Sequence, residues 1–466
     1  MKKKLIYIFT ISCVFLTCLS IGRIDISKDR RYHQHLKEDI ADLPVIDIDT
    51  KGQKIPGTPL SLDNQGYELS EDGNETIIAS IKIKGQNKLR LQTTIRYRGN
   101  TSRYFDKKSY ALHLIDQKGD ENAKKLLGMG SHDEWVLHGP FLDRTMLRNY
   151  VCFNVSGEIM DYAPNVRYCE LYVNGAYQGL YLLMETITRG NSRLNISKPD
   201  KNQRTTSFVV HFERETKGKN MIDHFSQYTY KTDISQLDVR YPGQSLLTSQ
   251  RKTYIQDEIS QVEKILYSMD LWDDQHGYHQ YLDLYEFARY FIINEFFRNV
   301  DAGHYSTYFY RDVRGKIKPC VWDFNNACNN YIADVWSEYG FSMQDAPWFS
   351  QLLKDEKFVS IVIHEYQKLR KSYLSEDYLI QYITQVDSWL EPVIKRNDQV
   401  WGYVYDVSNY DPFTYLTPIE RNPHSHQEAI EDLKEFIEKR GQWLDKHIES
   451  LYQYSATSKN ASEMIR

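Results

Sequence analysis

The hydrophobic period of this chain changes near residue 250, and that change limits the folds available to it. Before that point, apolar and polar residues alternate in short runs, as in half-buried β-strands. After it, apolar residues recur every three or four positions, as in amphipathic helices; Ile255, Ile259, Val262, Leu266 and Met269 are one such stripe. Strands in one part and helices in the other predict an α+β fold with a mainly helical C-terminal part, and not a repeating βαβ fold.

Two hairpins are predicted in the β-rich part. The runs TIIASIKIKG and NKLRLQTTIRYRG meet near residues 85–87, and VRYCELYVNGAYQGLYLLMET carries Asn174 and Gly175 between aromatic and β-branched runs. Asn-Gly between alternating runs is typical of a two-residue turn. Further strands are predicted at LPVIDID, KSYALHLI and SFVVHFER, the last closing the β-rich part, and a helix capped near Asp143 lies between the hairpins.

The helical part has its own start and stop signals. Asp283 with Glu286 forms a capping box before DLYEFARYFIINEFFRNV, and the final helix is expected to be interrupted at Gly441. One β-hairpin, STYFYRDVRGKIKPCVWDF, is embedded among these helices. The length permits two lobes, each with its own core. The predicted organisation is a targeting segment (1–24), a spacer (25–42), a β-rich lobe (43–215), a helical lobe (216–453) and a flexible tail (454–466).

The N-terminus predicts export. Three lysines precede a long uncharged apolar run, so we expect an extracytoplasmic body tethered to the membrane, through either an uncleaved helix or a lipid on Cys18. Four cysteines remain in the body; Cys152 with Cys169 and Cys320 with Cys328 either pair or stay as buried thiols. The net charge of −5 gives no broad basic surface, so no nucleic-acid partner is expected.

Two carboxylates flank the embedded hairpin. Asp301 follows the helix before it and Asp323 follows its second strand, so both are expected at one mouth of the hairpin. Asn325 and neighbouring asparagines add amide oxygens, and such hard oxygen ligands suit Mg²⁺. The alternative is that the two aspartates only cap a turn and a strand end. His304 is either a base or a surface histidine.

A basic loop offers candidate phosphate ligands. Arg98, Arg103, Lys107 and Lys108 surround a Gly-Asn turn, and such a loop either holds phosphate or is simply solvated. If the apolar residues of the following strand face inward, alternation places Lys108 on the same face. A buried lysine requires an acidic partner, for which Glu185 at the end of a predicted strand is the candidate.

Taken together, these segments resemble the CotH family, the spore-coat-protein-H type kinases with an atypical protein-kinase-like, two-lobe fold, and within it the exported group from Bacteroides-like bacteria. The matching segments, in order, are LPVIDIDTKG, RGNTSRYFDKKSYALHL, LLGMGSHDEWVLHGPFLDRTMLRN, ELYVNGAYQGLYLLMET, NVDAGHYSTYFYRD with KPCVWDFN, and FIEKRGQWLD. The resemblance implies transfer of the ATP γ-phosphate to Ser or Thr hydroxyls of a protein, with Mg²⁺ or Mn²⁺.

The resemblance also implies roles for particular residues. Lys107 or Lys108 would bind the nucleotide phosphates, with Glu185 as the ion-pair partner. Asp301 would be the catalytic acidic residue beside the attacking hydroxyl, and Asp323 would hold the metal. 

Many members of the family have Asp where this chain has Asn325, an amide that still offers a carbonyl ligand but carries no charge. That difference and the export signal support an alternative function, a catalytically silent CotH-like module that binds a surface protein or glycan. A third possibility is a metal-dependent hydrolase that uses Asp301 and Asp323.

Overall fold

The structure is a computed structural model that describes residues 42–58, 75–84, 89–99, 101–213, 220–228, 236–268, 271, 273 and 275–455. The predicted targeting segment, the spacer except Asp42, the tail after Ser455, the first hairpin turn, Met269 and Asn100 of the basic loop lie outside these residues. The first two residues of the predicted flexible tail belong to the short helix α9 (Tyr452–Ser455). Within the described ranges, no helix is long and apolar enough to cross a membrane.

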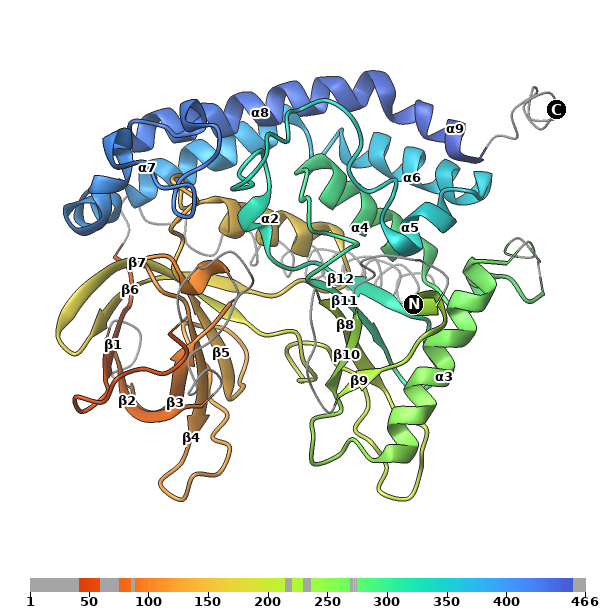
Figure 1. Ribbon diagram of the computed structural model, residues 1–466, viewed down its shortest axis with the longest axis horizontal. Helices are drawn as coiled ribbons and strands as arrows, with labels where there is room; N and C mark the ends of the chain where they lie inside the picture. Colours follow the sequence, from red (N-terminus) through yellow and green to blue (C-terminus); the bar gives the residue numbers. More distant parts are fainter. Residues whose placement is uncertain are drawn as a thin grey trace, which may run out of the picture.

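A closed barrel of seven strands forms one end of the molecule (Figure 1). The strand order is β1-β2-β3-β4-β5-β7-β6, and a parallel contact between β1 and β6 closes it. Alternate residues such as Ile81, Ile95 and Leu112 point inward and form a separate core. Closure leaves this sheet without a free edge. The strands are β1 (Val45–Asp49), β2 (Ile77–Lys84), β3 (Leu89–Tyr97), β4 (Tyr110–Ile115), β5 (Glu134–His138), β6 (Val166–Val173) and β7 (Ala176–Glu185).

The predicted hairpin of β6 and β7 is confirmed. Val173 pairs with Ala176, and the two turn residues, Asn174 and Gly175, have φ values of 52° and 80°. Positive φ at both positions is the conformation that an Asn-Gly turn supplies at low cost. The Asn174 side chain also accepts a hydrogen bond from the Thr50 amide at 2.9 Å, which fixes the turn to the end of β1.

A second sheet lies beside the barrel, with strand order β12-β11-β8-β10-β9 (Figure 1). The prediction that SFVVHFER closes the β-rich part is wrong, because β8 pairs with β10 and with β11 of the embedded hairpin. The barrel has no open edge left for β8, so the strand pairs with partners from the helical part. The strands are β8 (Phe208–Glu213), β9 (Met221–Ile222), β10 (Gln236–Tyr241), β11 (Thr307–Arg311) and β12 (Lys318–Cys320).

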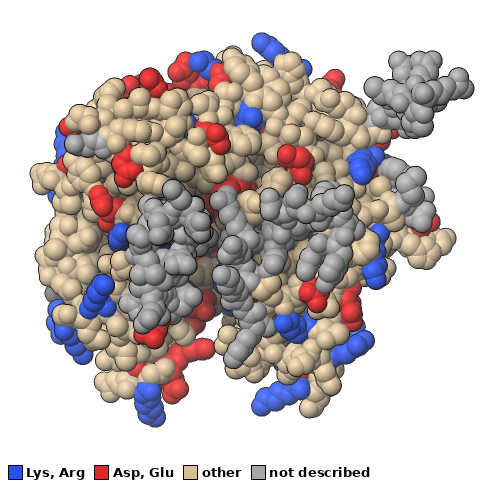
Figure 2. Space-filling view, in the orientation of Figure 1, with Lys and Arg blue, Asp and Glu red and all other residues tan. Residues whose placement is uncertain are grey.

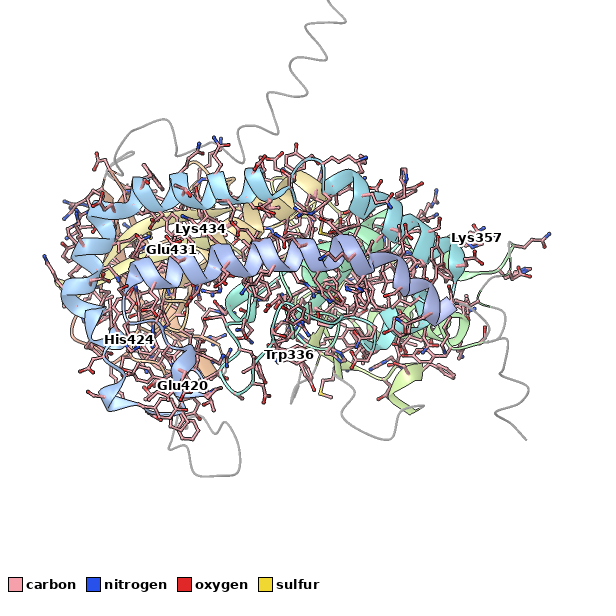
Figure 3. All side chains as sticks on the ribbon, turned by 90° about the horizontal axis from the view of Figure 1, so that it is seen from above. Trp336, Lys357, Glu420, His424, Glu431 and Lys434 are labelled. Atoms are coloured by element: carbon pink, nitrogen blue, oxygen red, sulfur yellow. The ribbon has the colours of Figure 1, made fainter. Side chains whose placement is uncertain are left out.

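Helices cover one side of both sheets. In Figure 1, α7 and α8 run across the top, and α7 packs on β7 of the barrel. Seen from above in Figure 3, α8 extends along the long axis and carries the labelled Glu431 and Lys434. On the face shown in Figure 2, basic and acidic side chains are interspersed among uncharged ones. The helices are α2 (Arg148–Ile159), α3 (Ser249–Leu266), α4 (Leu284–Phe296), α5 (Pro347–Leu352), α6 (Glu356–Leu369), α7 (Glu376–Trp401), α8 (His426–His447) and α9 (Tyr452–Ser455).

One predicted helix boundary is confirmed and another is wrong. Asp283 caps α4, where its carboxylate accepts a hydrogen bond from the Glu286 amide at 3.3 Å. The expected interruption at Gly441 does not occur, because α8 continues through it. A Cβ at this position would lie 2.6 Å from a guanidinium nitrogen of Arg370. The glycine therefore makes room for a side chain of another helix.

Candidate functional site

Asp301 and Asp323 lie at the mouth of the β11–β12 hairpin. Tyr308 pairs with Cys320 across the hairpin, so the segments before β11 and after β12 leave it at the same end. Two consecutive asparagine side chains donate hydrogen bonds to the two carboxylates. The Asn326 side-chain amide donates to Asp301 Oδ2 at 2.7 Å, and that of Asn325 donates to Asp323 Oδ1 at 2.5 Å. Both aspartates are half-buried, so the site keeps access to solvent.

The backbone at Asp323 has an uncommon conformation. Its φ is 54° and its ψ 75°, in the left-handed region, where few residues other than Gly, Asn and Asp are found. The strand direction therefore changes abruptly at the carboxylate, and a short 3₁₀ turn (Phe324–Asn326) follows. Residues held in such conformations often occur at functional sites, where the surrounding structure enforces them.

Asn149 enforces this turn, and sequence reasoning missed it. Its side-chain carbonyl accepts from the Phe324 amide at 3.0 Å, while its amide donates to Asn325 Oδ1 at 2.6 Å. The same amide lies 3.1 Å from His138 Nε2, whose pKa is lowered to about 3 by burial and by the nearby Arg98 and Lys107 charges. His138 is therefore neutral and can accept this hydrogen bond.

Arg148, next to Asn149, anchors the segment after the turn. Its guanidinium donates to the carbonyls of Ala327 at 3.1 Å and Cys328 at 3.3 Å, and pairs with Asp143 at 2.6 Å. A cap was predicted near Asp143. The Asp143 carboxylate accepts from the backbone amide of Arg148, the first residue of α2, at 2.9 Å, but the N-cap position itself is Leu147, which has no capping side-chain hydrogen bond. The segment DRTMLRN, from which only a helix start was predicted, also contains Arg148 and Asn149, the two residues that hold the turn of the site in place.

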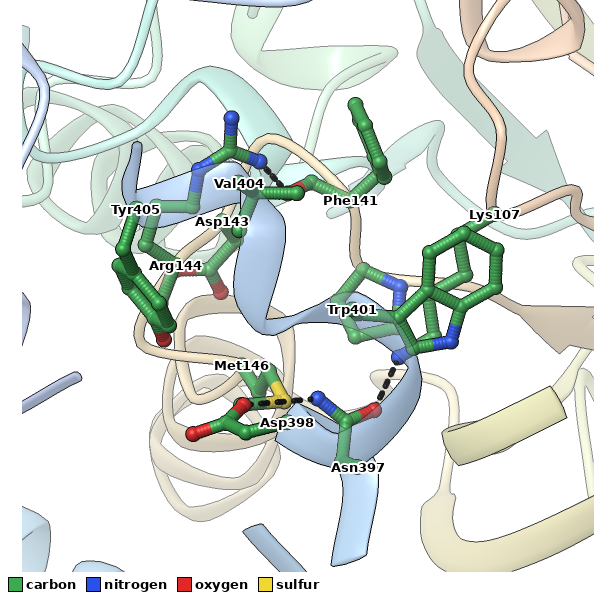
Figure 4. Close-up of a pocket in the computed structure, with 11 residues that line it drawn as sticks. Lys107, Phe141, Asp143, Arg144, Met146, Asn397, Asp398, Trp401, Val404 and Tyr405 are labelled. Carbon is green, nitrogen blue, oxygen red and sulfur yellow. Dashed lines mark hydrogen bonds between the residues drawn. The ribbon is translucent and has the colours of Figure 1, made fainter. Parts of the chain in front are cut away.

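Lys107 is fully buried. Its ammonium donates to Asn397 Oδ1 at 2.7 Å and lies between the rings of Tyr181 (5.3 Å) and Trp401 (5.9 Å). Figure 4 shows the small pocket around it, which the end of α7 covers. Burial lowers the pKa of Lys107 to about 7, and the charge of Asp398 opposes this only in part.

The ion pair expected between Lys108 and Glu185 does not form. Lys108 is half-buried and donates to the Arg103 carbonyl at 2.7 Å, because β4 begins only at Tyr110 and alternation does not extend back to Lys108. Tyr181 on β7 donates to the Lys108 carbonyl at 2.9 Å. Glu185 lies four residues further along that strand, roughly 13 Å away.

Glu185 has partners of its own. Its buried carboxylate accepts from the Asn165 backbone amide at 2.9 Å, the Asn165 side-chain amide at 3.0 Å and the Tyr162 hydroxyl at 3.4 Å. Glu185 thus orders the loop before β6, and neither lysine of the basic loop is its ion-pair partner.

Arg98 is the predicted phosphate ligand that does lie at the site. Its guanidinium is placed over the Trp322 ring, 5.8 Å from the centroid, and Trp322 immediately precedes Asp323. The backbone amide of Arg98 donates to the Ser109 carbonyl at 3.0 Å, which ties the end of β3 to β4. The barrel therefore brings one arginine to the segment of the helical part that carries Asp323.

Two remaining expectations are decided by burial. His304 Nε2 faces the exposed Asp345 at 3.4 Å, which favours a surface histidine over a base. The four body cysteines are buried and free, so the proposed disulfides are absent. Cys169 points into the barrel core whereas Cys152 lies in the main core, so these two side chains are on different sides of the sheet.

The donor set suits Mg²⁺. Asp323 and Asp301 offer carboxylate oxygens, and Asn325 offers an amide oxygen that already accepts from Asn149. Mg²⁺ is usually bound by one or two carboxylates and completes its octahedron with water and phosphate oxygens. A small set of protein oxygens open to solvent therefore fits this ion.

A barrel, a second sheet covered by helices, and a carboxylate–amide site at a hairpin mouth define the class, an α+β protein with a β-rich N-terminal part and a mainly helical C-terminal part. The family model described as CotH kinase protein matches residues 95–444, and the chain belongs to the CotH family. The inner spore coat protein H of Bacillus subtilis (strain 168) is similar, with 22% identity over 405 residues, which cover 82% of this chain and 94% of that protein. The predicted family membership is confirmed.

Proposed function

We propose that this protein is a Mg²⁺-dependent protein kinase that transfers the γ-phosphate of ATP to Ser or Thr hydroxyls of a protein. One observation carries the proposal: Asp301 and Asp323 come from separate segments and are held by consecutive amides at one solvent-accessible place. Membership of the CotH kinase family supports it. The export signal supports an acceptor protein on the cell surface or in the periplasm, and membrane attachment of the kinase.

Each carboxylate has a separate task in this reaction. The acceptor hydroxyl oxygen forms a bond to the γ-phosphorus, the bond from that phosphorus to the β–γ bridging oxygen breaks, and ADP leaves with the electron pair. Asp301 orients the hydroxyl and receives its proton. Asp323 and Asn325 would hold Mg²⁺ or Mn²⁺, which neutralises charge on the phosphate oxygens when bound. Asn149 and Arg148 keep the turn of these ligands in place.

Nucleotide binding tests the proposal. The melting temperature of the full-length protein in detergent would be measured with ATP, with and without Mg²⁺, for the wild type, Asp323→Ala and the control Asp334→Ala, an exposed acid in the following loop. Binding at 100 times the dissociation constant stabilises a protein by about 2.7 kcal/mol. We expect a Mg²⁺-dependent rise that Asp323→Ala abolishes and Asp334→Ala retains. No rise at millimolar ATP in a folded wild type would refute the nucleotide site.

Two observations favour a second candidate, a catalytically silent module that binds a surface protein or glycan. The Asn325 amide donates directly to Asp323, so it occupies one carboxylate oxygen, and Lys107 is sealed beneath α7. If ATP and Mg²⁺ leave the melting temperature unchanged, this candidate predicts binding to exported surface components that Asp323→Ala does not weaken. Phosphate transfer from radiolabelled ATP to any protein, lost in Asp301→Asn, would exclude it.

A further inference from the structure

The outer face of β3 carries arginines toward the second sheet. Ile95 points into the barrel, so by alternation Arg96 lies on its outside. Arg98 follows the last residue of β3, and both arginines are half-buried. A continuous set of ring contacts connects them to the second sheet. Trp322 lies beneath Arg98, its ring centroid is 5.9 Å from that of Tyr308, and Tyr308 stacks on His211 at 4.1 Å.

Arg240 joins this group from β10. Its guanidinium lies 3.4 Å from His211 Nδ1, and it also pairs with Asp238 at 3.4 Å while remaining about half exposed. The pKa of His211 is held well below its ordinary value by burial and then by the charges of Arg240 and Arg98, so this ring is neutral. Arg96, Arg98 and Arg240 are therefore the cations of one region in which the barrel meets the second sheet.

Two of these three charges are not compensated by a described carboxylate, whereas Arg240 pairs with Asp238. Throughout the described ranges, Arg96 and Arg98 form no ion pair with a carboxylate; the Arg96 side chain donates only to the Tyr97 carbonyl, at 3.2 Å. The pKa of Arg96 is lowered by burial and then by Arg98 and Arg240. A half-buried group of like charges is unfavourable unless an anion joins it, so the arrangement fits a multiply charged ligand.

Arg103 has a different task. Its guanidinium donates to the carbonyls of Gly99 at 2.6 Å and Gly57 at 3.3 Å, which fixes the end of β3. Burial, with the charges of Arg96 and Arg98, lowers its pKa to about 10. Arg103 is therefore a positioning residue for the two arginines that precede it.

We infer that Arg96, Arg98 and Arg240 form a polyphosphate-binding site, and that the triphosphate of the nucleotide donor occupies it. Planar guanidinium groups bind phosphate oxygens bidentately, which suits a chain of phosphates better than a single ion. The site adjoins the segment that carries Asp323, because Arg98 lies over the ring of Trp322, the residue immediately before it. This assignment rests on the proposed kinase function. It gives the arginines the phosphate-binding role expected of Lys107 and Lys108, whose ammonium groups are bound to Asn397 and to the Arg103 carbonyl.

Inorganic tripolyphosphate tests the site without adenine. Its binding to the full-length protein would be measured by calorimetry, in parallel with ATP and Mg²⁺, for wild type, Arg98→Ala, Arg240→Ala and the control Arg90→Ala. Arg90 is exposed on the same strand and the same outer face. We expect Arg98→Ala and Arg240→Ala each to weaken binding of both ligands at least about tenfold, because each substitution removes charge-assisted hydrogen bonds to phosphate oxygens. Arg90→Ala should match the wild type.

The result separates this inference from the kinase proposal. Absence of tripolyphosphate binding, or an equal loss in Arg90→Ala, would overturn the polyphosphate site. If ATP binds and Asp323→Ala weakens it while Arg98→Ala and Arg240→Ala do not, the kinase proposal stands and the arginine assignment falls. If both arginine variants lose tripolyphosphate but ATP binds no better with Mg²⁺ and is insensitive to Asp323→Ala, the site takes inorganic polyphosphate and the nucleotide assignment is overturned.

Discussion

The buried Lys107 predicts a specific dependence of stability on pH. Its pKa falls from 10.5 in a solvated side chain to about 7 in the folded protein, because burial penalises the ammonium. Between these two values the unfolded chain binds one more proton than the folded chain, so the free energy of unfolding rises with pH. Below about pH 7 both states carry the charge, and the whole cost of burying it is present.

The magnitude follows from that difference in pKa. At 1.36 kcal/mol per pH unit, the interval from about 7 to 10.5 corresponds to about 5 kcal/mol, an order-of-magnitude value. In Lys107→Met this contribution is absent. Asn397 Oδ1 still accepts from the Leu180 amide at 3.1 Å, so the substitution leaves no carbonyl without a donor. We expect the difference in unfolding free energy, wild type minus variant, to rise by about 3 kcal/mol between pH 7 and pH 9.5.

The assay is urea unfolding followed by tryptophan fluorescence at several pH values. Lys118→Met, at an exposed turn, controls for the loss of a lysine and a charge. A difference between wild type and Lys107→Met that stays constant within about 0.5 kcal/mol over this range would refute the reasoning. Such a result would mean that the amine remains charged in the folded protein and that Lys107 could serve as a phosphate ligand after all.

Two further perturbations test the site and its supports, and a third tests a buried ion pair between α8 and α4. Asn325→Asp should increase the rise in melting temperature on adding Mg²⁺, because the new carboxylate and that of Asp323 repel each other until a cation binds. An unchanged or smaller rise would contradict the metal assignment. Asn149→Ala should weaken Mg²⁺-dependent ATP binding at least about tenfold with little change in fold by circular dichroism, because two hydrogen bonds that fix the turn are lost; wild-type affinity would argue against a positioning role. Arg440→Met should lower the unfolding free energy by about 3–5 kcal/mol in urea titrations, because it leaves the buried Glu295 carboxylate without its charge partner at 2.6 Å; a loss below about 1 kcal/mol would show that this pair is not needed.

Several turns and helices could be predicted because each depends on residues that are close together in the sequence. The Asn174-Gly175 turn, the Asp283 cap and the helical stripe of α3 depend on residues within a few positions of one another, and all are present. The mouth of the embedded hairpin was predictable for the same reason, since a short turn fixes which ends meet. The segment order that resembles the CotH family is likewise a property of the sequence, and the family match confirms it.

The basic loop shows where local reasoning failed. Alternation predicted a buried Lys108 with Glu185 as its partner, but the side chain that is buried is Lys107, and the group that receives it is Asn397, 290 positions away. No local pattern specifies that α7 packs on β7, because packing between elements far apart in the chain depends on the shapes of both surfaces. Asn149 was missed for the same reason, because its side chain accepts a hydrogen bond from a turn 175 residues further along the chain.

The sequence by itself determined the α+β character, the hairpins, the capped helices, the family and the pair of carboxylates at one hairpin mouth, because each follows from periodicity, turn chemistry or residue order. Only the tertiary structure decided that seven strands close into a barrel, that β8 belongs to the second sheet, and that Arg98 comes to lie over Trp322, the residue before Asp323. The physical reason is that desolvation and pairing act between side chains that meet in space. Whether an ionisable group is buried, neutral or available to a ligand depends on the neighbours that the fold places around it.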